Sequence, residues 1–423
     1  MRVALIHDWL TGQRGGERVL EHLVEIYPKA DIYTLIHVPG TVSPAIERRV
    51  IHTSPLSRLP GIARYYRVLL PFFPWAIRGF RLEGYDLIVS VSHAVAKGIS
   101  VPEGTPHLCY CLTPMRYVWD QVDHYLGRGL RRAISLPLAA YLRRFDTLTS
   151  TPAAVTRFVA ISHAVADRID RHYGRQADVV YPPVDVERIQ PDGRPPDDFY
   201  LLVGGFVPYK CERVAIEAFR LLERRGLKRR LVVVGDGPSR AALQRDAPSC
   251  VEFSGRVSDA ELAKLFARCR ALIYPQEEDF GISAVEAQAA GRPVIAFAQG
   301  GARDTVLPLL PLATAAGSKM STDPSADRVS GPVSDWERAP REPAGGAPSS
   351  PDPPPGRHPT GIWFASQTEE ALISALQLFE EHESEFRSDR IRNWAEGFGG
   401  TRFREQWQLQ VDALFRQSPG QQR

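Results

Sequence analysis

The chain has 423 residues, enough for two domains that each bury a substantial core. Its formal net charge is only +3, so the charge balance gives no reason to expect a nucleic-acid partner. The five cysteines lack the paired spacing of a zinc site, and Cys109 and Cys111 lie in an apolar run typical of core packing. We therefore expect a cytoplasmic protein that holds no metal.

The first strand is expected at residues 2–6, because this run is short and apolar after its first residue. A loop ending in Gly15 and Gly16 follows, before a helix expected at residues 17–27. Adjacent glycines let the backbone approach a phosphate, and a helix start favours negative charge. Because the chain begins with this strand, we expect no signal peptide, and no apolar run reaches the ~18 residues of a membrane span.

Residues 57–81 combine arginines and aromatic rings with no acidic residue. A second basic cluster surrounds an apolar stretch and consists of Arg128, Arg131, Arg132, Arg143 and Arg144. Arginines between exposed rings suit an anionic membrane, where the rings enter the headgroup layer and the guanidiniums meet phosphates. In the alternative interpretation, the rings form helix core and the arginines are solvated. The first interpretation predicts peripheral contact with the inner face of the cell membrane.

The tetrapeptide SHAV occurs at residues 92–95 and 162–165, each time after an apolar strand. At both places we expect the serine to cap a helix by accepting a hydrogen bond from a backbone amide. His93 is a candidate contact for an acceptor or a phosphate, with a locally satisfied turn histidine as the alternative. Arg116, after the strand expected at residues 107–112, is a second such candidate, with an ion pair at a helix start as the alternative.

Residues 181–198 are rich in proline and acidic residues and are interpreted as a hinge. The hinge separates an expected N-terminal domain, residues 1–186, from an expected C-terminal domain, residues 187–401. The second domain is expected to open with a strand at residues 199–203, followed by a loop and a helix.

Two further segments complete the predicted organisation. Residues 307–359 are rich in proline, glycine and serine, a composition that cannot bury a core, so we expect a disordered insertion. Residues 402–423 are expected to contain a helix that carries Phe403, Trp407 and Val411 on one face.

Residues 271–296 read ALIYPQEEDFGISAVEAQAAGRPVIA and predict a strand, an acidic loop, a helix and a second strand. In doubly wound sheets, ligands bind at such a loop, and the carboxylates of Glu278 and Glu286 are placed to face one ligand there. The amides at the start of the helix favour phosphate or sugar oxygens. In the alternative interpretation, Ser283 and Glu286 form a capping box that only fixes the helix start.

This stretch resembles the donor-sugar motif of the retaining glycosyltransferases called family 4. Residues 107–120 resemble a subgroup described as mannosyl- or rhamnosyltransferases of cell-surface polysaccharide synthesis. The resemblance implies the GT-B fold, an α/β architecture of two Rossmann-like domains facing each other across a cleft, with a C-terminal helix that crosses back onto the first domain. The residues on which donor contacts would fall are Gly15, Gly16, Lys210, Val257, Glu278, Asp279, Phe280, Gly281, Ile282 and Glu286.

Within this resemblance, Glu278 and the amides after it contact the donor sugar and the diphosphate, and Glu286 holds the ribose. Lys210 balances the charge of the leaving diphosphate, and Gly15 and Gly16 lie near it. The backbone near Val257 meets the nucleobase.

Two positions depart from the pattern of the family. Leu112 stands where the subgroup has a histidine beside the reacting sugar, and leucine neither orients a hydroxyl nor stabilises charge. Gly205 stands where the family has an arginine on the diphosphate, for which Arg213 and Arg14 are candidate replacements. A charge-assisted hydrogen bond of that kind contributes roughly 1.5–3 kcal/mol.

The resemblance implies a metal-independent transfer, with retention, of a sugar from a nucleotide-sugar to a glycan or a lipid-linked glycan. A GDP-mannose-like donor is favoured, and no cofactor is expected. The alternative is a degenerate relative that binds a nucleotide-sugar or a glycan, or serves as a scaffold, without turnover. A nicotinamide oxidoreductase is disfavoured, because the chain lacks the GxGxxG fingerprint.

Overall fold

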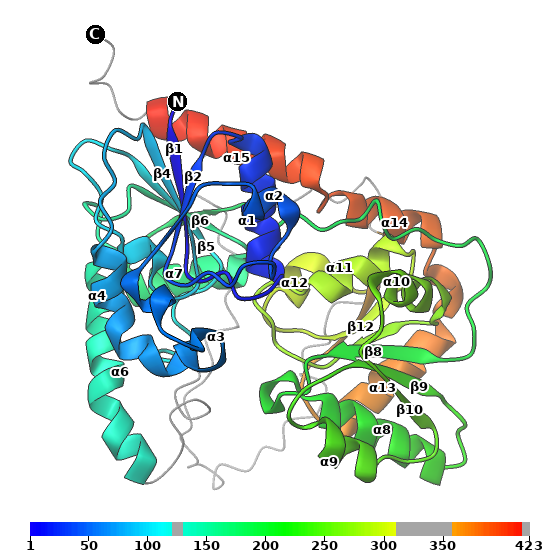
Figure 1. Ribbon diagram of the computed structural model, residues 1–423. Coiled ribbons are helices and arrows are strands. Elements are labelled where there is room, and N and C mark those ends of the chain that lie inside the picture. Colours follow the sequence, from blue (N-terminus) through cyan, green and yellow to red (C-terminus); the bar gives the residue numbers. More distant parts are fainter. Residues whose placement is uncertain (121–129, 310–357, 417–423) are drawn as a thin grey trace, which may run out of the picture.

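The computed structural model describes residues 1–120, 130–309 and 358–416, which form two α/β halves (Figure 1). The strands of the N-terminal half are β1 (Val3–His7), β2 (Asp31–Thr34), β3 (Ile51–Thr53), β4 (Leu87–Ser92), β5 (His107–Cys111), β6 (Arg157–Ala160) and β7 (Ala177–Val179). The strands of the C-terminal half are β8 (Tyr200–Gly204), β9 (Leu231–Gly235), β10 (Val251–Gly255), β11 (Leu272–Tyr274), β12 (Val294–Phe297) and β13 (Gly361–Phe364).

Helices lie between most of these strands. Those of the N-terminal half are α1 (Gly15–Ile26), α2 (Pro44–Glu47), α3 (Ile62–Tyr65), α4 (Phe73–Arg78), α6 (Leu130–Leu148) and α7 (His163–Tyr173). Those that follow are α8 (Glu212–Arg224), α9 (Arg240–Arg245), α10 (Asp259–Arg268), α11 (Ile282–Ala289), α12 (Ala302–Thr305), α13 (Glu369–Glu381), α14 (Ser388–Glu396) and α15 (Gly400–Arg416). Short 3₁₀ segments are η1 (Pro55–Arg58), η2 (Tyr66–Phe72), η3 (Ala96–Gly98), η4 (Pro208–Lys210) and η6 (Glu383–Glu385).

The two sheets have the same parallel topology. The first has the strand order β3-β2-β1-β4-β5-β6-β7 and the second the order β10-β9-β8-β11-β12-β13. In each sheet the chain reverses its direction of winding once, between β1 and β4 and between β8 and β11. The carboxyl ends of the strands at such a point form a crevice in which doubly wound proteins bind ligands. The expected pair of Rossmann-like domains is therefore confirmed, while the proposed boundary between residues 186 and 187 stays a prediction.

The strands at the centre of each sheet are apolar because helices cover both sheet faces. All residues of β1, β4 and β5 are buried, as expected for parallel strands packed on both sides. Cys109 and Cys111 are fully buried in β5, which confirms their interpretation as core residues. Val3 pairs in register with Leu87, and His7 pairs with Val91, so β1 and β4 end together at the crevice.

The two SHAV segments fold differently. Ser162 caps α7 as predicted, with its hydroxyl accepting a hydrogen bond from the amide of Val165 at 3.2 Å. Ser92 does not start an α-helix, because the amides that follow it donate to the carboxylate of Asp8, and only η3 forms. The prediction of a helix after Ser92 is therefore wrong.

The first helix begins at Gly15, two residues before the expected start at residue 17. The amide of Arg14 donates to the carboxylate of Glu17 at 3.1 Å. This hydrogen bond stabilises the first turn of α1, which includes both glycines. The amides of Gly15 and Gly16 therefore belong to the positive end of α1.

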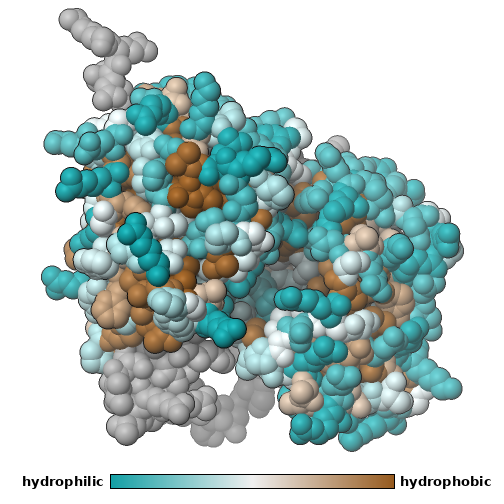
Figure 2. Space-filling view, viewed as in Figure 1, coloured by the Kyte–Doolittle hydropathy of each residue, from teal (hydrophilic) through white to brown (hydrophobic). Residues whose placement is uncertain are grey.

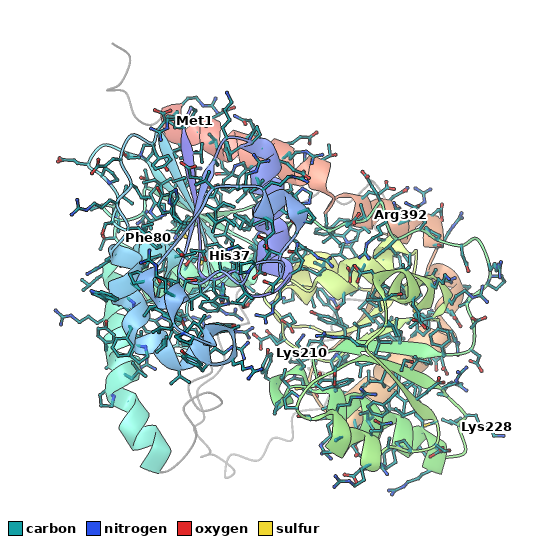
Figure 3. All side chains as sticks on the ribbon, in the orientation of Figure 1. Met1, His37, Phe80, Lys210, Lys228 and Arg392 are labelled. Carbon is teal, nitrogen blue, oxygen red and sulfur yellow. The ribbon has the colours of Figure 1, made fainter. Side chains whose placement is uncertain are left out.

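The chain returns to the N-terminal half through its last two helices (Figure 1). Arg392 on α14 donates to the carbonyl oxygens of Val186, at 2.7 Å, and Ala289, at 2.8 Å (Figure 3). On α15, Phe403, Trp407 and Val411 are buried as predicted. The indole of Trp407 donates to the hydroxyl of Tyr27 on the N-terminal half at 3.0 Å. The expected crossing back of the C-terminal helix is confirmed.

Most of the predicted insertion, residues 307–359, lies outside the described residues. The first residue of the predicted insertion, Leu307, is hydrogen-bonded to Thr360, the residue that follows the insertion. The amide of Thr360 donates to the carbonyl of Leu307 at 2.8 Å, and the amide of Leu307 donates to the Thr360 hydroxyl at 2.8 Å. The chain thus leaves this edge of the second sheet and re-enters it at β13.

Candidate active site

The predicted site residues follow the carboxyl ends of strands in both sheets, mostly central strands, with the edge strand β10 as the exception. Gly15 and Gly16 follow β1, His93 follows β4, and Arg116 follows β5. Lys210 follows β8, Val257 follows β10, and residues 278–282 follow β11. The structure therefore brings segments from the two halves to one place between the winding reversals of the two sheets.

The start of α1 faces the start of α11 across the cleft. A Cβ atom placed on Gly15 would lie 3.1 Å from the side chain of Ile282, so the first residues of the two helices lie close together. Gly281 precedes α11 with φ +97°, and a Cβ atom there would lie 2.7 Å from the Tyr274 hydroxyl, so both conformation and space require glycine. Two positive helix ends that meet in this way favour an anionic ligand.

Lys210 supplies a cation beside these helix starts. Its Nζ lies 3.1 Å from Oε1 of Glu278, and both side chains are about one quarter exposed, at 25% and 24%. Figure 3 places Lys210 on the side of the C-terminal half that is turned toward the N-terminal half. A Cβ atom on Gly205 would lie 3.8 Å from the Lys210 side chain. An arginine at position 205, as in the family pattern, would therefore have its Cβ atom beside the side chain of Lys210.

Glu286 is buried inside α11 and has partners from outside that helix. Its Oε1 lies 3.4 Å from Arg18 on α1 and 3.7 Å from Arg188. Burial raises the pKa of Glu286, while the charges of Arg18 and Arg188 act in the opposite direction. Gly281 is the residue that precedes the helix, so Glu286 is not at a capping position and the capping-box interpretation is wrong.

Val257 lies in the turn before α10, and Arg188 joins Asp259, the first residue of α10, to Glu286. Arg188 contacts Asp259 at 2.9 Å and Glu286 at 3.7 Å. The turn that would meet a nucleobase and the carboxylate that would hold a ribose are therefore neighbours.

Asp279 and Phe280 do not present their side chains freely to a ligand. One carboxylate oxygen of Asp279 pairs with Arg116 at 3.2 Å and the other with Arg168. Phe280 is 3% exposed and packs on the rings of Tyr181 and Phe398, so only its backbone is available to a donor. The ion pair of Arg116 is not local to a helix start, as the alternative proposed, but joins the two halves.

Asp8 organises the crevice of the first sheet. Its buried carboxylate accepts hydrogen bonds from the amides of His93, Ala94, Val95 and Ala96, at 2.7–3.0 Å. The ring of His93 adds a contact at 3.1 Å. Burial opposes ionisation, but the charge and hydrogen bonds of His93 lower the pKa of Asp8 to about 2. The His93 side chain is 28% exposed, and its Nδ1 lies near Asp8 without completing a hydrogen bond, so its predicted contact with an acceptor or a phosphate stays a prediction.

Replacing Asp8 by asparagine is expected to cost about 3 kcal/mol or more of unfolding free energy, because four buried amides lose a charged acceptor. The carboxamide keeps the shape but turns a donor group toward other donors. Denaturant unfolding measures the loss, with Asp86→Asn on an exposed side chain as the control. Because the pKa of Asp8 is depressed, its stabilising contribution is present above the ordinary aspartate pKa and is lost as the pH falls toward 2. A loss no larger than that of the control would contradict this assignment.

Leu112 and His7 lie beneath the glycine loop. A Cβ atom on Gly16 would lie 2.9 Å from Cδ1 of Leu112 and 3.2 Å from Nε2 of His7. Leu112 therefore stands next to the start of α1 and gives this part of the cleft an apolar wall. Burial lowers the pKa of His7, whose Nδ1 is 3.0 Å from the carbonyl oxygen of Trp9.

No sequence pattern pointed to Arg168 on α7, whose side chain is 8% exposed. Arg168 pairs with Asp279 and, at 3.1 Å, with Glu277, both on the acidic loop of the opposite half. A third carboxylate, Asp120 of its own half, lies 3.7 Å away. The distance in sequence between these partners explains why no local pattern reveals them.

His163 at the start of α7 makes another contact between the halves. Its backbone amide donates to one oxygen of Asp304 at 2.8 Å, and its ring Nδ1 lies 2.9 Å from the other. The hydrogen bond with Asp304 raises the pKa of His163, against the effect of burial. The Tyr181 hydroxyl also lies 3.4 Å from this ring nitrogen.

The contact predicts a pH-dependent contribution to stability. A raised pKa means that the stabilisation is full below the ordinary histidine pKa and disappears as the pH rises through the raised value. The difference in thermal midpoint between the wild type and His163→Gln should therefore shrink between about pH 5.5 and pH 8.5. In an Asp304→Asn background the difference should not vary with pH. A difference that is constant in both backgrounds would contradict the prediction.

Across residues 1–120, 130–309 and 358–416, no group of three or more histidine, cysteine, aspartate or glutamate side chains is arranged to hold a metal ion. In the same part of the chain, each helix is too short or too polar to span a bilayer.

Two protein-family models match the chain. Residues 13–188 match the model described as Glycosyltransferase Family 4, and residues 185–310 match the model described as Glycosyl transferases group 1. A D-inositol 3-phosphate glycosyltransferase of Streptomyces avermitilis is 35% identical over 195 residues, which are 39% of this chain and 40% of that protein. A GDP-mannose-dependent alpha-mannosyltransferase of Mycolicibacterium smegmatis is 38% identical over 159 residues, which are 35% of this chain and 40% of that protein. The matched region thus spans about two fifths of each relative.

Solved structures share the fold at low identity. Anabaena Alr3699/HepE in complex with UDP has a TM-score of 0.60 and 14% identity, with 98% of this chain and 100% of that chain covered. Sucrose-phosphate synthase from Thermosynechococcus elongatus has a TM-score of 0.62 and 17% identity, with 99% and 100% covered. The two matching models, over residues 13–188 and 185–310, both describe glycosyltransferases, and the solved structures share the fold of two parallel-sheet halves.

Proposed function

We propose that this protein transfers a sugar from a nucleotide-sugar to a glycan or a lipid-linked glycan, with retention of configuration. The observation that carries the proposal is the meeting of two helix starts with one lysine in the cleft. Gly15 at the start of α1 lies close to Ile282 at the start of α11, and Lys210 lies on the same side of the second sheet. This arrangement suits a diphosphate, whose negative charge grows as the sugar leaves.

The residues support the following chemistry. The acceptor hydroxyl oxygen bonds to the anomeric carbon on the face from which the diphosphate oxygen departs, and the hydroxyl proton passes to that departing oxygen. Lys210 and the amides of Gly281 and Ile282 stabilise the charge on the diphosphate. Glu278 holds the sugar and Glu286 the ribose. Such a reaction depends on positioning and charge stabilisation, so it uses no carboxylate nucleophile and no cofactor.

A GDP-mannose-like donor is favoured. The support is the mycobacterial relative, whose name includes GDP-mannose and whose matched segment is 38% identical.

The first test is whether the whole chain transfers sugar from a donor. Purified protein is incubated with GDP-, UDP- and dTDP-sugars and a membrane lipid extract, and donor consumption, product and anomeric configuration are measured. Thermal unfolding with each nucleotide is measured in parallel. Transfer from one donor class with retention supports the proposal. Stabilisation by a nucleotide without turnover supports the second candidate, a degenerate binder, which Leu112 and Gly205 favour. An absence of both effects would overturn the proposal.

An anionic membrane surface is the proposed location of the acceptor. In the segment of residues 57–81, Tyr66 and Phe73 are buried. The most exposed large apolar side chains are Val68 at 74%, Trp75 at 63% and Phe72 at 56%. Figure 2 displays apolar side chains gathered over this part of the N-terminal half.

Charged groups surround the apolar patch. A shallow groove of about 500 Å³ beside it is lined by Trp75, Arg78, Tyr141, Arg144 and Leu148, among others. Of the second basic cluster, Arg128 and the side chains of Arg131 and Arg132 lie outside the described residues. Apolar rings bordered by arginines suit insertion into an anionic headgroup layer.

Vesicle flotation tests this location. The wild type is expected to float with vesicles that contain anionic lipid and not with purely zwitterionic ones. Phe72→Ser/Trp75→Ser is expected to reduce the bound fraction about 10-fold or more, because two rings no longer enter the lipid. Leu409→Ser, an exposed residue on α15, serves as the control. Equal binding of all three proteins would contradict the proposed surface.

A further inference from the structure

The acidic loop after β11 is held by arginines of the opposite half. Arg168 contacts Glu277 and Asp279, and Arg116 contacts the second oxygen of Asp279 at 3.2 Å. We call these two arginines and two carboxylates the arginine clamp. All four side chains belong to the described residues, and the arginines are 8% and 15% exposed.

The clamp exists only while the two halves are together. A guanidinium removed from water is stable when carboxylates compensate its charge, and an unpaired one is costly. Within its own half Arg168 has Asp120 at 3.7 Å, and that carboxylate also lies 3.2 Å from Nε2 of His172. If the halves separated, Arg168 would keep only Asp120, which is the most distant of its partners. It would share that carboxylate with His172.

The clamp also determines where Glu278 points. Glu277 and Asp279 face the arginines of the N-terminal half, whereas Glu278 between them faces Lys210 of its own half at 3.1 Å. The loop is fixed on its other side by Phe280, which packs between Tyr181 and Phe398. Holding residues 277 and 279 thus orients the carboxylate that is proposed to bind the sugar.

We propose that Arg168 is a positioning residue, which closes the cleft and orients Glu278 through Glu277 and Asp279 without touching the donor itself. The effect on turnover rests on the proposed function, whereas the effect on closure does not. Asp279, predicted to contact the donor, belongs on this inference to the clamp.

Arg168→Gln is expected to raise the KM for the donor and to lower kcat/KM about 100-fold, the scale of a loss caused by misplacing a reacting group. Glu277→Gln is also expected to raise the KM for the donor, but by a smaller factor, because Arg168 would keep its contact with Asp279 on the same loop. Arg168→Lys restores part of the loss, since an ammonium replaces one contact but does not bridge two carboxylates. Asp120→Asn is the matched control, because it removes a partner of Arg168 within the same half.

Closure is measured separately by small-angle X-ray scattering without donor. Arg168→Gln and Glu277→Gln are expected to have a larger radius of gyration than the wild type and Asp120→Asn. If Arg168→Gln does not fold, the inference is tested with Glu277→Gln alone. The Glu277 side chain is 45% exposed, so this substitution is expected to leave the fold intact. Unchanged scattering and KM in Glu277→Gln, or equal changes in Asp120→Asn, would overturn the inference. An inactive wild type would end the proposed function, while expansion of the clamp variants would still support the clamp.

Discussion

Replacing Glu278 by alanine is expected to abolish measurable sugar transfer while leaving the fold intact. Glu278 lies on a loop after β11, at the edge of the sheet where both helix starts meet, and its side chain is 24% exposed. Loss of one group that contacts the reacting sugar is expected to reduce kcat by roughly 10²–10³-fold or more, since preorganised polar contacts act mainly in the transition state.

The initial rate of sugar transfer is measured with the donor found in the screen of nucleotide-sugars, and the affinity for the nucleotide is measured in parallel. Glu370→Ala, an exposed glutamate on α13, is the matched control and should retain full activity. In Glu278→Ala, nucleotide binding should be retained or tightened, because Lys210 loses its paired carboxylate. A variant that keeps its turnover would contradict the role of Glu278, and one that loses both turnover and binding would indicate a collapse of the loop.

Replacing Lys210 by alanine is expected to lower kcat by roughly 10²–10³-fold, because the departing diphosphate loses its nearest side-chain cation. Because Gly205 stands where the family has an arginine, we expect the effect of replacing Lys210 to be large. A second cation of the family pattern is missing there, so the side chain of Lys210 acts with less support from its own half.

Lys228 provides the control for Lys210. Both lysines belong to the C-terminal half, but Lys228 is exposed and lies at the side far from the cleft (Figure 3). Lys228→Ala should leave kcat and KM unchanged, whereas Lys210→Ala should lose kcat and bind the nucleoside diphosphate more weakly. Equal rates in the two variants would mean that Arg18 or Arg116, which also approach the site, supplies the charge.

Local sequence patterns were sufficient for most of the fold. Short apolar runs predicted strands that the structure buries on both faces, such as β1 and β4, because a parallel sheet covered by helices exposes neither face. The helical spacing of Phe403, Trp407 and Val411 identified the buried face of α15. The hydroxyl of Ser162 was recognisable as a cap because its partner is three residues away.

The same local reasoning failed where a distant group took the expected hydrogen bonds. Ser92 is followed by the same tetrapeptide as Ser162, yet its helix does not form, since the carboxylate of Asp8 occupies the amides. Glu286 fits a capping box by spacing, yet it pairs with Arg18, which is 268 residues away in the chain. In both cases a partner brought near by the sheet topology competes with the local one.

By itself, the sequence determined many of the strands and helices and the loops on which Gly15, Lys210 and Glu278 lie. These features follow from periodicity and turn chemistry, which act over a few residues, whereas the pair of Rossmann-like sheets was expected from the resemblance to a family. Only the tertiary structure decided which charges meet across the cleft. Arg168 and Asp279 are 111 residues apart, and His163 and Asp304 are 141 residues apart. No periodic pattern spans such distances, so these contacts exist only because the two sheets place their carboxyl ends face to face.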